Sequence, residues 1–460
     1  MSTFSGIQQA ANSLAASQYG LQIVSQNISN ASTPGYTRQA VDLASVDPVG
    51  GVPRRYAVGG GPGGVTVTGT SRLNDSVIDA RARTEHSHSA QADTTAAQLS
   101  QIEDIFPEPS DTGLSEQLST FWSDWAKVAN DPGSTAPRTV LLQDGATVAS
   151  TLNSMSTSLS DVAASTTQSL GNDVDAANTA ATQLNSVNSQ IAIGTATGAN
   201  VNSLLDQRDQ LLDQLSSLVG GVATINPNGT ASVQVGGQDL VIGAYNGTPA
   251  SVNSITVDST PTVSVGGTGV TLTGGSAAAS VTTLTTTLPQ MQSQLDAVAS
   301  ALASAVNGAQ ANGYDLSGNA GTAIFGTSDG SGTVTAANIA VTMTDPSLVA
   351  AAATSSSGGN LDGGNALVAS NLGSAAGSAD KLYGGLVGQI GSASKLAQQQ
   401  QSTQDAVTAS VDTLRQSASG VNLDEELTNM LTLQRAYQAS SRVLTTMDSL
   451  LDTLINHTGA

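Results

Sequence analysis

The chain of 460 residues contains no cysteine. Disulfides, thiolate nucleophiles and cysteine-based metal sites are therefore excluded together. Aromatic residues make up only 3% of the chain and charged residues only 11%, while small polar residues dominate. Extracellular polymeric proteins and disordered chains both have few aromatic residues and many small polar ones. The periodicity of the apolar residues must decide between these two classes.

Basic residues are scarce and unevenly placed. Fourteen Lys and Arg stand against 35 Asp and Glu, for a formal net charge of −21, and none lies between Arg208 and Lys381. An acidic chain without a basic patch in its body is poorly suited to nucleic acids or anionic membranes. No apolar run approaches the ~18–20 residues of a membrane span, and residues 1–30 lack the features of a secretory signal. We therefore expect no nucleic-acid partner and no membrane span.

The clearest pattern lies at the C-terminal end, between Val421 and His457. Apolar residues recur there every seven positions, and a second set lies three positions later, with Ser440 as a polar interruption. This spacing predicts a helix of about 30 residues with one apolar seam. The seam residues are Leu423, Met430, Leu433, Tyr437, Leu444, Met447, Leu451 and Leu454.

A matching pattern lies at the other end, over residues 3–29. Its apolar stripe consists of Phe4, Ile7, Leu14, Leu21 and Ile28. We expect the two terminal helices to pack on each other, or on copies of each other, and their apolar residues to form the assembly interface. A bundle within one chain is the simpler alternative, but it does not explain why both ends carry only one apolar face. Such ends are expected to be poorly ordered until neighbours cover them.

The interior combines helical periods with one β-like region. Seven-residue spacing predicts a helix of about 50 residues after Pro137, interrupted at Gly194 and Gly198, and further helices over 72–106, 289–307 and from Leu386 to Gly420. Residues 222–288 are rich in Thr, Val and Gly and alternate as strands do. We predict an α+β fold: an elongated multidomain subunit with paired coiled-coil-like terminal helices, a long helical-bundle domain and a small inserted β domain. The expected domains are 1–35 with 421–460 (terminal), 36–221 with 289–420 (helical middle) and 222–288 (β-rich outer).

No constellation of residues indicates catalysis or metal binding. His86 and His88 lie two apart on a predicted helix and cannot face the same way, so we expect a solvated pair. Glu425 and Glu426 have no His, Lys or Cys nearby in sequence and are expected on the helix surface. Their charge suits the first turn of the last helix. We expect no enzyme activity, no cofactor and no metal.

The most specific motif follows the first helix: Asn27-Ile-Ser-Asn-Ala-Ser-Thr-Pro-Gly-Tyr-Thr-Arg-Gln39. It resembles the signature shared by the rod, hook and junction proteins of the bacterial flagellar axial family, although Ser29 stands where that family often has Ala. Leu423–Ile455 is similar to the family's C-terminal helix. The residues of this chain that match the family signature, and that we expect to share its role, are Asn27, Asn30, Thr33, Pro34, Gly35 and Tyr36.

Three internal segments indicate which members of that family the chain resembles. Pro137-Arg138, Leu204–Leu212 and Asn307–Phe325 resemble segments of the members that join hook to filament. The Leu204–Leu212 segment argues against the first alternative, another axial protein such as a hook or rod subunit. A secreted adhesin is the second alternative, supported only by the Thr- and Gly-rich middle.

The resemblance implies a structural subunit of the extracellular bacterial flagellum, located at the hook–filament junction and secreted through the type III export apparatus. It implies a homo-oligomeric ring in which the terminal helices form an inner tube and the β domain faces outward. The implied partners are the hook subunit, a second junction protein and an export chaperone that binds the C-terminal helix.

Overall fold

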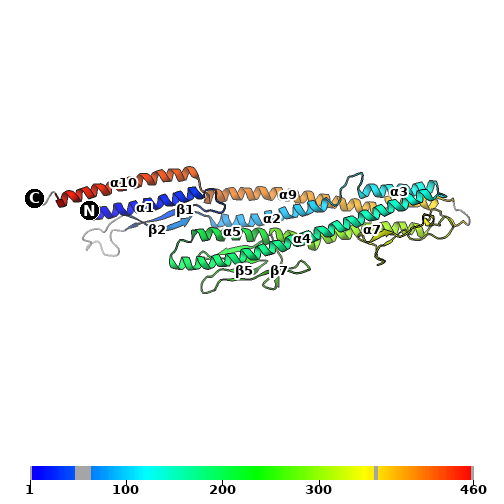
Figure 1. Cartoon of the computed structure of the whole chain (residues 1–460), viewed down its shortest axis with the longest axis horizontal. Coiled ribbons are helices and arrows are strands. Elements are labelled where there is room, and N and C mark those ends of the chain that lie inside the picture. The colour runs from blue at the N-terminus through cyan, green and yellow to red at the C-terminus, as the bar shows by residue number, and fades with distance from the viewer. Residues whose placement is uncertain (1–2, 47–63, 357–360, 457–460) are drawn as a thin grey trace.

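Most of the helices run side by side along one long axis, so the molecule is an elongated rod (Figure 1). The structure is a computed structural model that describes residues 3–46, 64–356 and 361–456. The start of α1 (Thr3–Asn30) and the end of α10 (Leu423–Asn456) lie at the same end of the rod. The predicted elongated α+β fold with paired terminal helices is confirmed.

One end of the rod consists of two helices and a strand pair. β1 (Gln39–Val46) and β2 (Gly64–Arg72) are antiparallel, with Gln39 opposite Arg72 and Val46 opposite Gly64. α1 packs on both strands and on α10. We call α1, β1, β2 and α10 the terminal unit. The chain passes between this unit and the rest of the rod just after β2 and just before α10.

The rest of the rod is a helical body. α2 (Ser76–Glu103) and α9 (Ala379–Ser419) lie side by side, and α4 (Thr135–Thr197) contacts α2. Its main apolar core contains Phe121, Trp125 and Leu152, all fully buried. The other elements of the body are α3 (Leu114–Asn130), α5 (Asn202–Val219), α6 (Gly275–Thr282), α7 (Leu288–Ala311), β10 (Phe325–Thr327), β11 (Ile339–Val341) and α8 (Gly364–Ala369).

The long helix α4 is longer than predicted. It has 63 residues instead of about 50. It begins before Pro137, because the hydroxyl of Ser134 caps it and proline is tolerated in a first helical turn. Gly194 does not interrupt the helix, which ends at Gly198. One interior glycine costs only about 1 kcal/mol, and the packing of α4 on α5 offsets a cost of that size.

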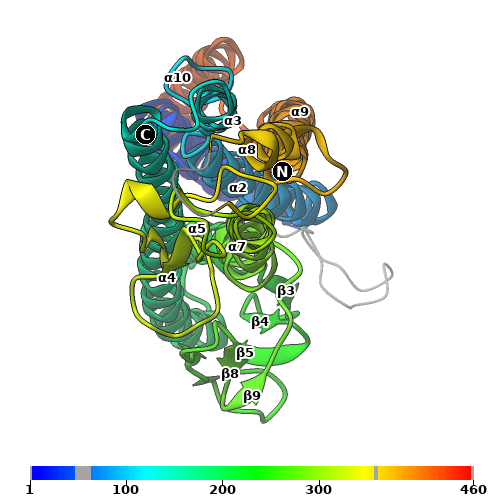
Figure 2. The same ribbon diagram turned by 90° about the vertical axis from the view of Figure 1, so that its right-hand side faces the viewer.

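The β region lies on one side of the rod, away from α10 (Figure 2). It contains a four-stranded sheet in the order β3-β4-β5-β6 and a three-stranded sheet in the order β7-β8-β9, with antiparallel neighbours throughout. A second core fills the space between these sheets and helices α4 and α5. The strands are β3 (Val222–Ile225), β4 (Ala231–Val235), β5 (Gln238–Ile242), β6 (Ser251–Val252), β7 (Ile255–Val257), β8 (Val263–Val265) and β9 (Thr268–Gly269).

The C-terminal boundary predicted for the β region is wrong. Residues 222–288 were expected to be β-rich, but the strands stop at Gly269 and α6 follows, then a π-helical turn at Thr283–Thr287. Ala277, Ala278 and Ala279 of α6 are buried, and the helix packs on α2, α4 and α5. Alanine is the best helix former, so this packing outweighs the β preference of the surrounding Val and Thr.

Candidate functional site

The two terminal helices meet in an antiparallel seam. A Cβ atom built at Gly20 of α1 would lie 3.0 Å from both methyl carbons of Leu433 on α10, and one at Gly6 would lie 2.9 Å from Met447 Cε. Fourteen residues separate the two contacts on each helix, and they run in opposite directions. Small residues on α1 therefore make room for the large side chains of α10.

The same register explains the polar interruption at Ser440. It lies seven residues from both Leu433 and Met447, so it is level with Ser13, which lies midway between Gly6 and Gly20. Both serines are half-buried. A small residue of α10 thus stands opposite a small polar residue of α1 at this one step of the seam.

The structure places most of the predicted interface residues along this seam. On α10, the half-buried ones are Met430, Leu433, Tyr437, Leu444, Met447 and Leu451, whereas Leu423 is exposed. On α1, Ile7, Leu14, Leu21 and Ile28 are half-buried. The side chains of Phe4 and Leu454 lie outside the described residues.

Apart from Asn27 of the motif, the most buried residues of α1 were not predicted as site residues. They are Ala10, Ala16, Ser17, Gly20, Ile23, Val24 and Asn27. Most are small, so they add little to an apolar pattern, and they are buried because α1 is covered by α10 on one side and by the two strands on another. The regular spacing of Gly6, Ser13 and Gly20 was the available signal.

One face of α10 carries apolar side chains that nothing in the described chain covers. Leu423, Leu427 and Leu431 are 49%, 50% and 56% exposed. They are four residues apart and therefore lie in one row along the helix. We call these three residues the outer ridge. Val443 and Leu450, seven residues apart on another face, are also exposed.

The motif after α1 closes the seam with buried polar contacts. Asn27 Nδ2 donates to the Gln39 carbonyl at 2.9 Å and to Glu426 Oε2 at 3.2 Å. Its Oδ1 accepts from the Gln39 amide at 3.0 Å and from the Tyr36 hydroxyl at 2.8 Å. Burial, together with the charges of Asp206 and Glu426, raises the pKa of Tyr36 to about 12, so the phenol stays neutral and donates.

The prediction that Glu426 lies on the helix surface is wrong. It is 1% exposed, and Arg38 Nε donates to its Oε1 at 2.7 Å. Its neighbour Glu425 is exposed as predicted and pairs with Arg38 Nη2 at 2.9 Å. A buried carboxylate needs a charged or hydrogen-bonding partner, and here Arg38 and Asn27 supply both. One signal was present, since Glu426 precedes Leu433 by seven residues and so occupies a seam position.

The turn of the motif packs on α5. Gly35 has φ +75°, and a Cβ there would collide with the side chain of Gln210. Gln210 Nε2 in turn donates to the Pro34 carbonyl at 2.7 Å. Thr33 Oγ1 donates to Asn30 Oδ1 at 3.2 Å within the turn. The segment Leu204–Leu212, singled out from the sequence, therefore forms part of the surface on which the motif rests.

Carboxylates of α5 hold the end of β2. Arg72 pairs with Asp206 at 2.9 Å and with Asp209 at 2.7 Å, and it also donates to Thr37 Oγ1 at 2.9 Å. Burial would raise the pKa of Asp209, but Arg208 and Arg72 outweigh burial and hold that pKa below its ordinary value. Asp209 is thus charged at neutral pH, and these pairs tie the terminal unit to the body.

A second arginine joins three helices of the body at the same level. Arg415 of α9 pairs with Asp79 of α2 at 3.0 Å and with Asp213 of α5 at 2.9 Å. His86 of α2 lies 2.9 Å from Asp412 of α9, so the predicted solvated histidine pair is wrong for His86. His88 is exposed. The two histidine side chains point in different directions, as expected for residues two apart on a helix.

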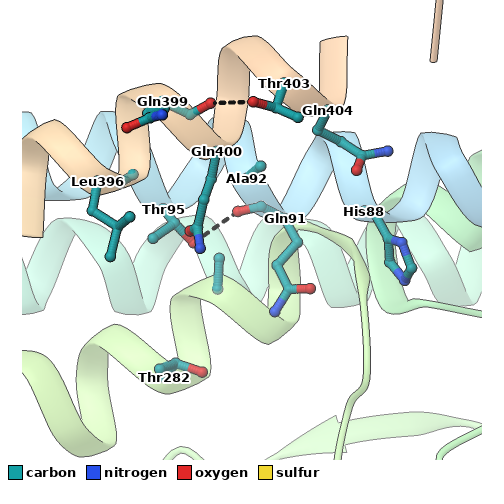
Figure 3. Close-up of a pocket in the computed structure, with 12 residues that line it drawn as sticks. His88, Gln91, Ala92, Thr95, Thr282, Leu396, Gln399, Gln400, Thr403 and Gln404 are labelled. Carbon is teal, nitrogen blue, oxygen red and sulfur yellow. Dashed lines mark hydrogen bonds between the residues drawn. The ribbon is translucent and has the colours of Figure 1, made fainter. Parts of the chain in front are cut away.

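A groove lies between α2, α6 and α9 (Figure 3). It has a volume of about 720 Å³, and its lining includes the amides of Gln91, Gln399, Gln400 and Gln404. His88 is its one titratable side chain. General acid–base or nucleophilic catalysis needs a reactive group beside a base, and this lining offers no such pair.

The described ranges contain no cluster of three or more His, Cys, Asp or Glu side chains that could hold a metal ion. None of the helices in the described part of the chain combines the length and apolarity needed to cross a bilayer.

Comparison with known proteins gives consistent matches. A family model described as "Flagellar hook-associated protein FlgK helical domain" matches residues 99–325, and "Flagellar basal body rod FlgEFG protein C-terminal" matches residues 415–457. Flagellar hook-associated protein 1 of Bacillus subtilis (strain 168) is 31% identical, over 100% of this chain and 99% of that protein. The protein of the same name from Escherichia coli (strain K12) is 27% identical, over 98% and 99%.

A solved structure has a similar fold. The flagellar hook junction protein FlgK from Burkholderia pseudomallei matches with a TM-score of 0.64 at 18% identity. The match covers 74% of this chain and 100% of that one.

Proposed function

The chain belongs to the flagellar hook-associated protein 1 family, and from this premise we propose that it is a structural subunit of the junction between hook and filament. The family is one of structural proteins of the extracellular flagellum. The observation that carries the finer proposal is the terminal unit, whose seam is closed within the chain while the outer ridge stays uncovered.

The outer ridge supports assembly through the terminal helices. Fully burying one leucine side chain contributes about 1.5–3 kcal/mol, so contact of Leu423, Leu427 and Leu431 with a neighbour would favour association. A surface that fits another part of the same chain repeats head to tail and closes into a ring when the rotation allows. We propose that copies of this chain form such a ring, with the terminal units lining its inner tube and the β region facing outward.

The predicted interface residues keep a role in this arrangement. Met430, Tyr437 and Leu444 contribute to the seam within the chain but remain half-exposed, so their outer edges are available to a neighbouring subunit. The seam sets the shape of the terminal unit, and the outer ridge and these edges make the contacts between subunits.

Further partners can be proposed for the ring and for α10. We propose that the ring contacts the hook subunit on one side and a second junction protein on the other. Before export through the type III apparatus, a chaperone would cover α10, because a helix with an uncovered apolar row would otherwise self-associate. The groove chemistry, without a reactive pair, favours a structural role over an enzymatic one.

A charge-insertion experiment in the full chain tests the assembly proposal. Leu427→Glu with Leu431→Glu places two charges on the outer ridge. The matched control is Thr428→Glu with Thr432→Glu, which adds the same charge at neighbouring exposed positions of the same helix. Each gene is expressed in flagellated cells that lack their own copy, and attached filaments are counted by electron microscopy.

We expect hooks without filaments, and filament protein in the medium, for the leucine variant only. Equal circular dichroism spectra of the purified proteins would show that both variants fold. Normal filaments with the leucine variant would contradict assembly through the outer ridge. A normal hook in cells lacking the gene separates this function from that of a hook or rod subunit. Normal filaments in those cells, with loss of surface attachment, would favour the adhesin alternative.

A further inference from the structure

Two adjacent chain segments beside α2, which we call the neck, connect the β region to the body. The chain enters the β region at Gly220 and Gly221, after α5, and leaves it at Thr273 and Gly274, before α6. The two strands of the neck touch, since a Cβ built at Gly220 would lie 2.7 Å from the Gly274 carbonyl oxygen. Only glycine permits so close a crossing. This crossing adds a second connection between the β region and the body, beside the apolar core that the sheets share with α4 and α5.

A cavity of about 160 Å³ lies between the neck and α2. Its walls are Arg83, Ser87 and His88 of α2, the entering segment Gly220–Ala223, and Thr273 of the leaving segment, among other residues. A water molecule takes up about 30 Å³ in the liquid. The cavity therefore has room for several waters or for one tetrahedral oxyanion.

Arg83 is buried in this wall without a partner. It is 6% exposed, yet its side chain makes no hydrogen bond or ion pair with any residue in the described ranges. The other buried arginines of α2's surroundings are all paired: Arg72 and Arg208 bind Asp209. None of its guanidinium nitrogens is fully enclosed by the described residues, so they stay within reach of a small ligand in the cavity and can donate to an oxyanion there.

The chain itself offers one carboxylate in the neighbourhood. Arg83 acts electrostatically on Asp213 of α5. However, Asp213 Oδ2 already accepts from Arg415 at 2.9 Å, and no ion pair joins Asp213 to Arg83. Asp213 lowers the net positive charge that a ligand would meet, but it supplies no hydrogen bond to the guanidinium.

Two further donors line the same cavity. The hydroxyl of buried Ser87 and the ring of exposed His88 make no hydrogen bond to the described residues. Ser87 follows Arg83 by four residues and so lies on the same face of α2. Thr84 is less available, since its hydroxyl donates to the Ala80 carbonyl at 3.2 Å.

We propose that the cavity at the neck binds a small tetrahedral oxyanion of the phosphate or sulfate class. Arg83 supplies the charged, forked donor that matches such oxyanions, and Ser87 and His88 donate to the remaining oxygens. Because the walls come from α2 and from both segments of the neck, the bound anion would add a polar contact between the β region and α2 to the apolar core that holds the sheets on α4 and α5.

Inorganic phosphate serves as the probe, with the full-length protein. Binding is measured by isothermal titration calorimetry, and thermal unfolding is followed in phosphate and in chloride at equal ionic strength. The test variant is Arg83→Gln. The control is Arg81→Gln, on the same helix, where the side chain is 60% exposed and pairs with Glu85 at 3.7 Å.

We expect phosphate to raise the unfolding midpoint of the wild type and of Arg81→Gln by about 2 °C relative to chloride. Arg83→Gln should lose that shift and bind phosphate at least ~10-fold more weakly. Ser87→Ala, a smaller change, should weaken binding about threefold and guards against a folding defect in Arg83→Gln. The same response of all three variants, or no heat of phosphate binding by the wild type, would overturn the proposal.

Discussion

Arg38 Nε donates a 2.7 Å hydrogen bond to Glu426 Oε1, although 388 residues separate the two in sequence. The contact joins the segment after the first helix to the first turn of the last one. Asn27 completes it from the end of α1. Both ends of the chain are therefore locked together at the point where the seam meets the body.

Removing the buried carboxylate of Glu426 should weaken the packing of α10 on α1. We expect Glu426→Ala to destabilise the packing of α10 on α1 by about 3 kcal/mol, because it leaves Arg38 without its buried partner. Glu425→Ala removes the exposed carboxylate of the same arginine and should cost under about 1 kcal/mol. Amide hydrogen exchange of α10 measures both effects. Equal exchange in the two variants would refute a lock at Glu426.

The register of the seam can be tested at its polar step. Ser440→Leu places a large side chain opposite Ser13 and should destabilise the terminal unit by about 1–2 kcal/mol through overpacking. Adding Ser13→Gly recreates the pairing seen at Gly20 and Leu433, so the double variant should recover part of the loss. A coupling energy of about 1 kcal/mol in the double-mutant cycle is expected.

Thermal unfolding of the four proteins in that cycle supplies the measurement, with Ser441→Leu on the exposed face as a control. Additive effects of Ser13→Gly and Ser440→Leu would show that the two positions do not face each other.

A carboxyl pair between α3 and α4 predicts a pH dependence. A hydrogen bond with Asp124, then burial and the charge of Asp124, raise the pKa of Asp144 from 3.8 to about 6. A pKa raised on folding means that protonation favours the folded state. The contribution of this group is therefore complete below about pH 3.8 and is lost as the pH rises through about 6.

Asp144→Asn keeps a donor toward Asp124 and cannot ionise. We expect it to match the wild type near pH 3.5, where the carboxyl is protonated in both states, and to unfold at higher urea concentration than the wild type near pH 8. Asp161→Asn, an exposed position on the same helix, is the control. A constant difference between Asp144→Asn and the wild type at both pH values would exclude ionisation of Asp144 as the cause.

The sequence indicated the terminal helices because their signal is local. The seven-residue spacing from Met430 to Leu451 depends only on the geometry of one helix, and that seam faces α1 in the structure. The motif from Asn27 to Gln39 was likewise legible, since Pro34 and Gly35 mark a turn by their own backbone preferences. The end of the β region was misjudged, because Ala277–Ala279 is helical through contacts with distant helices.

What the sequence determined by itself is the pair of terminal helices with their apolar faces, the long helices of the body and the family to which the chain belongs. Only the tertiary structure decided which charges are buried. Arg83 carries no local sign of burial, and the seam position of Glu426 does not identify its partners. The residues that surround Glu426 come from the opposite end of the chain, and those around Arg83 come from three separate segments. The outer ridge, too, emerged only once α1 had covered the other face of α10.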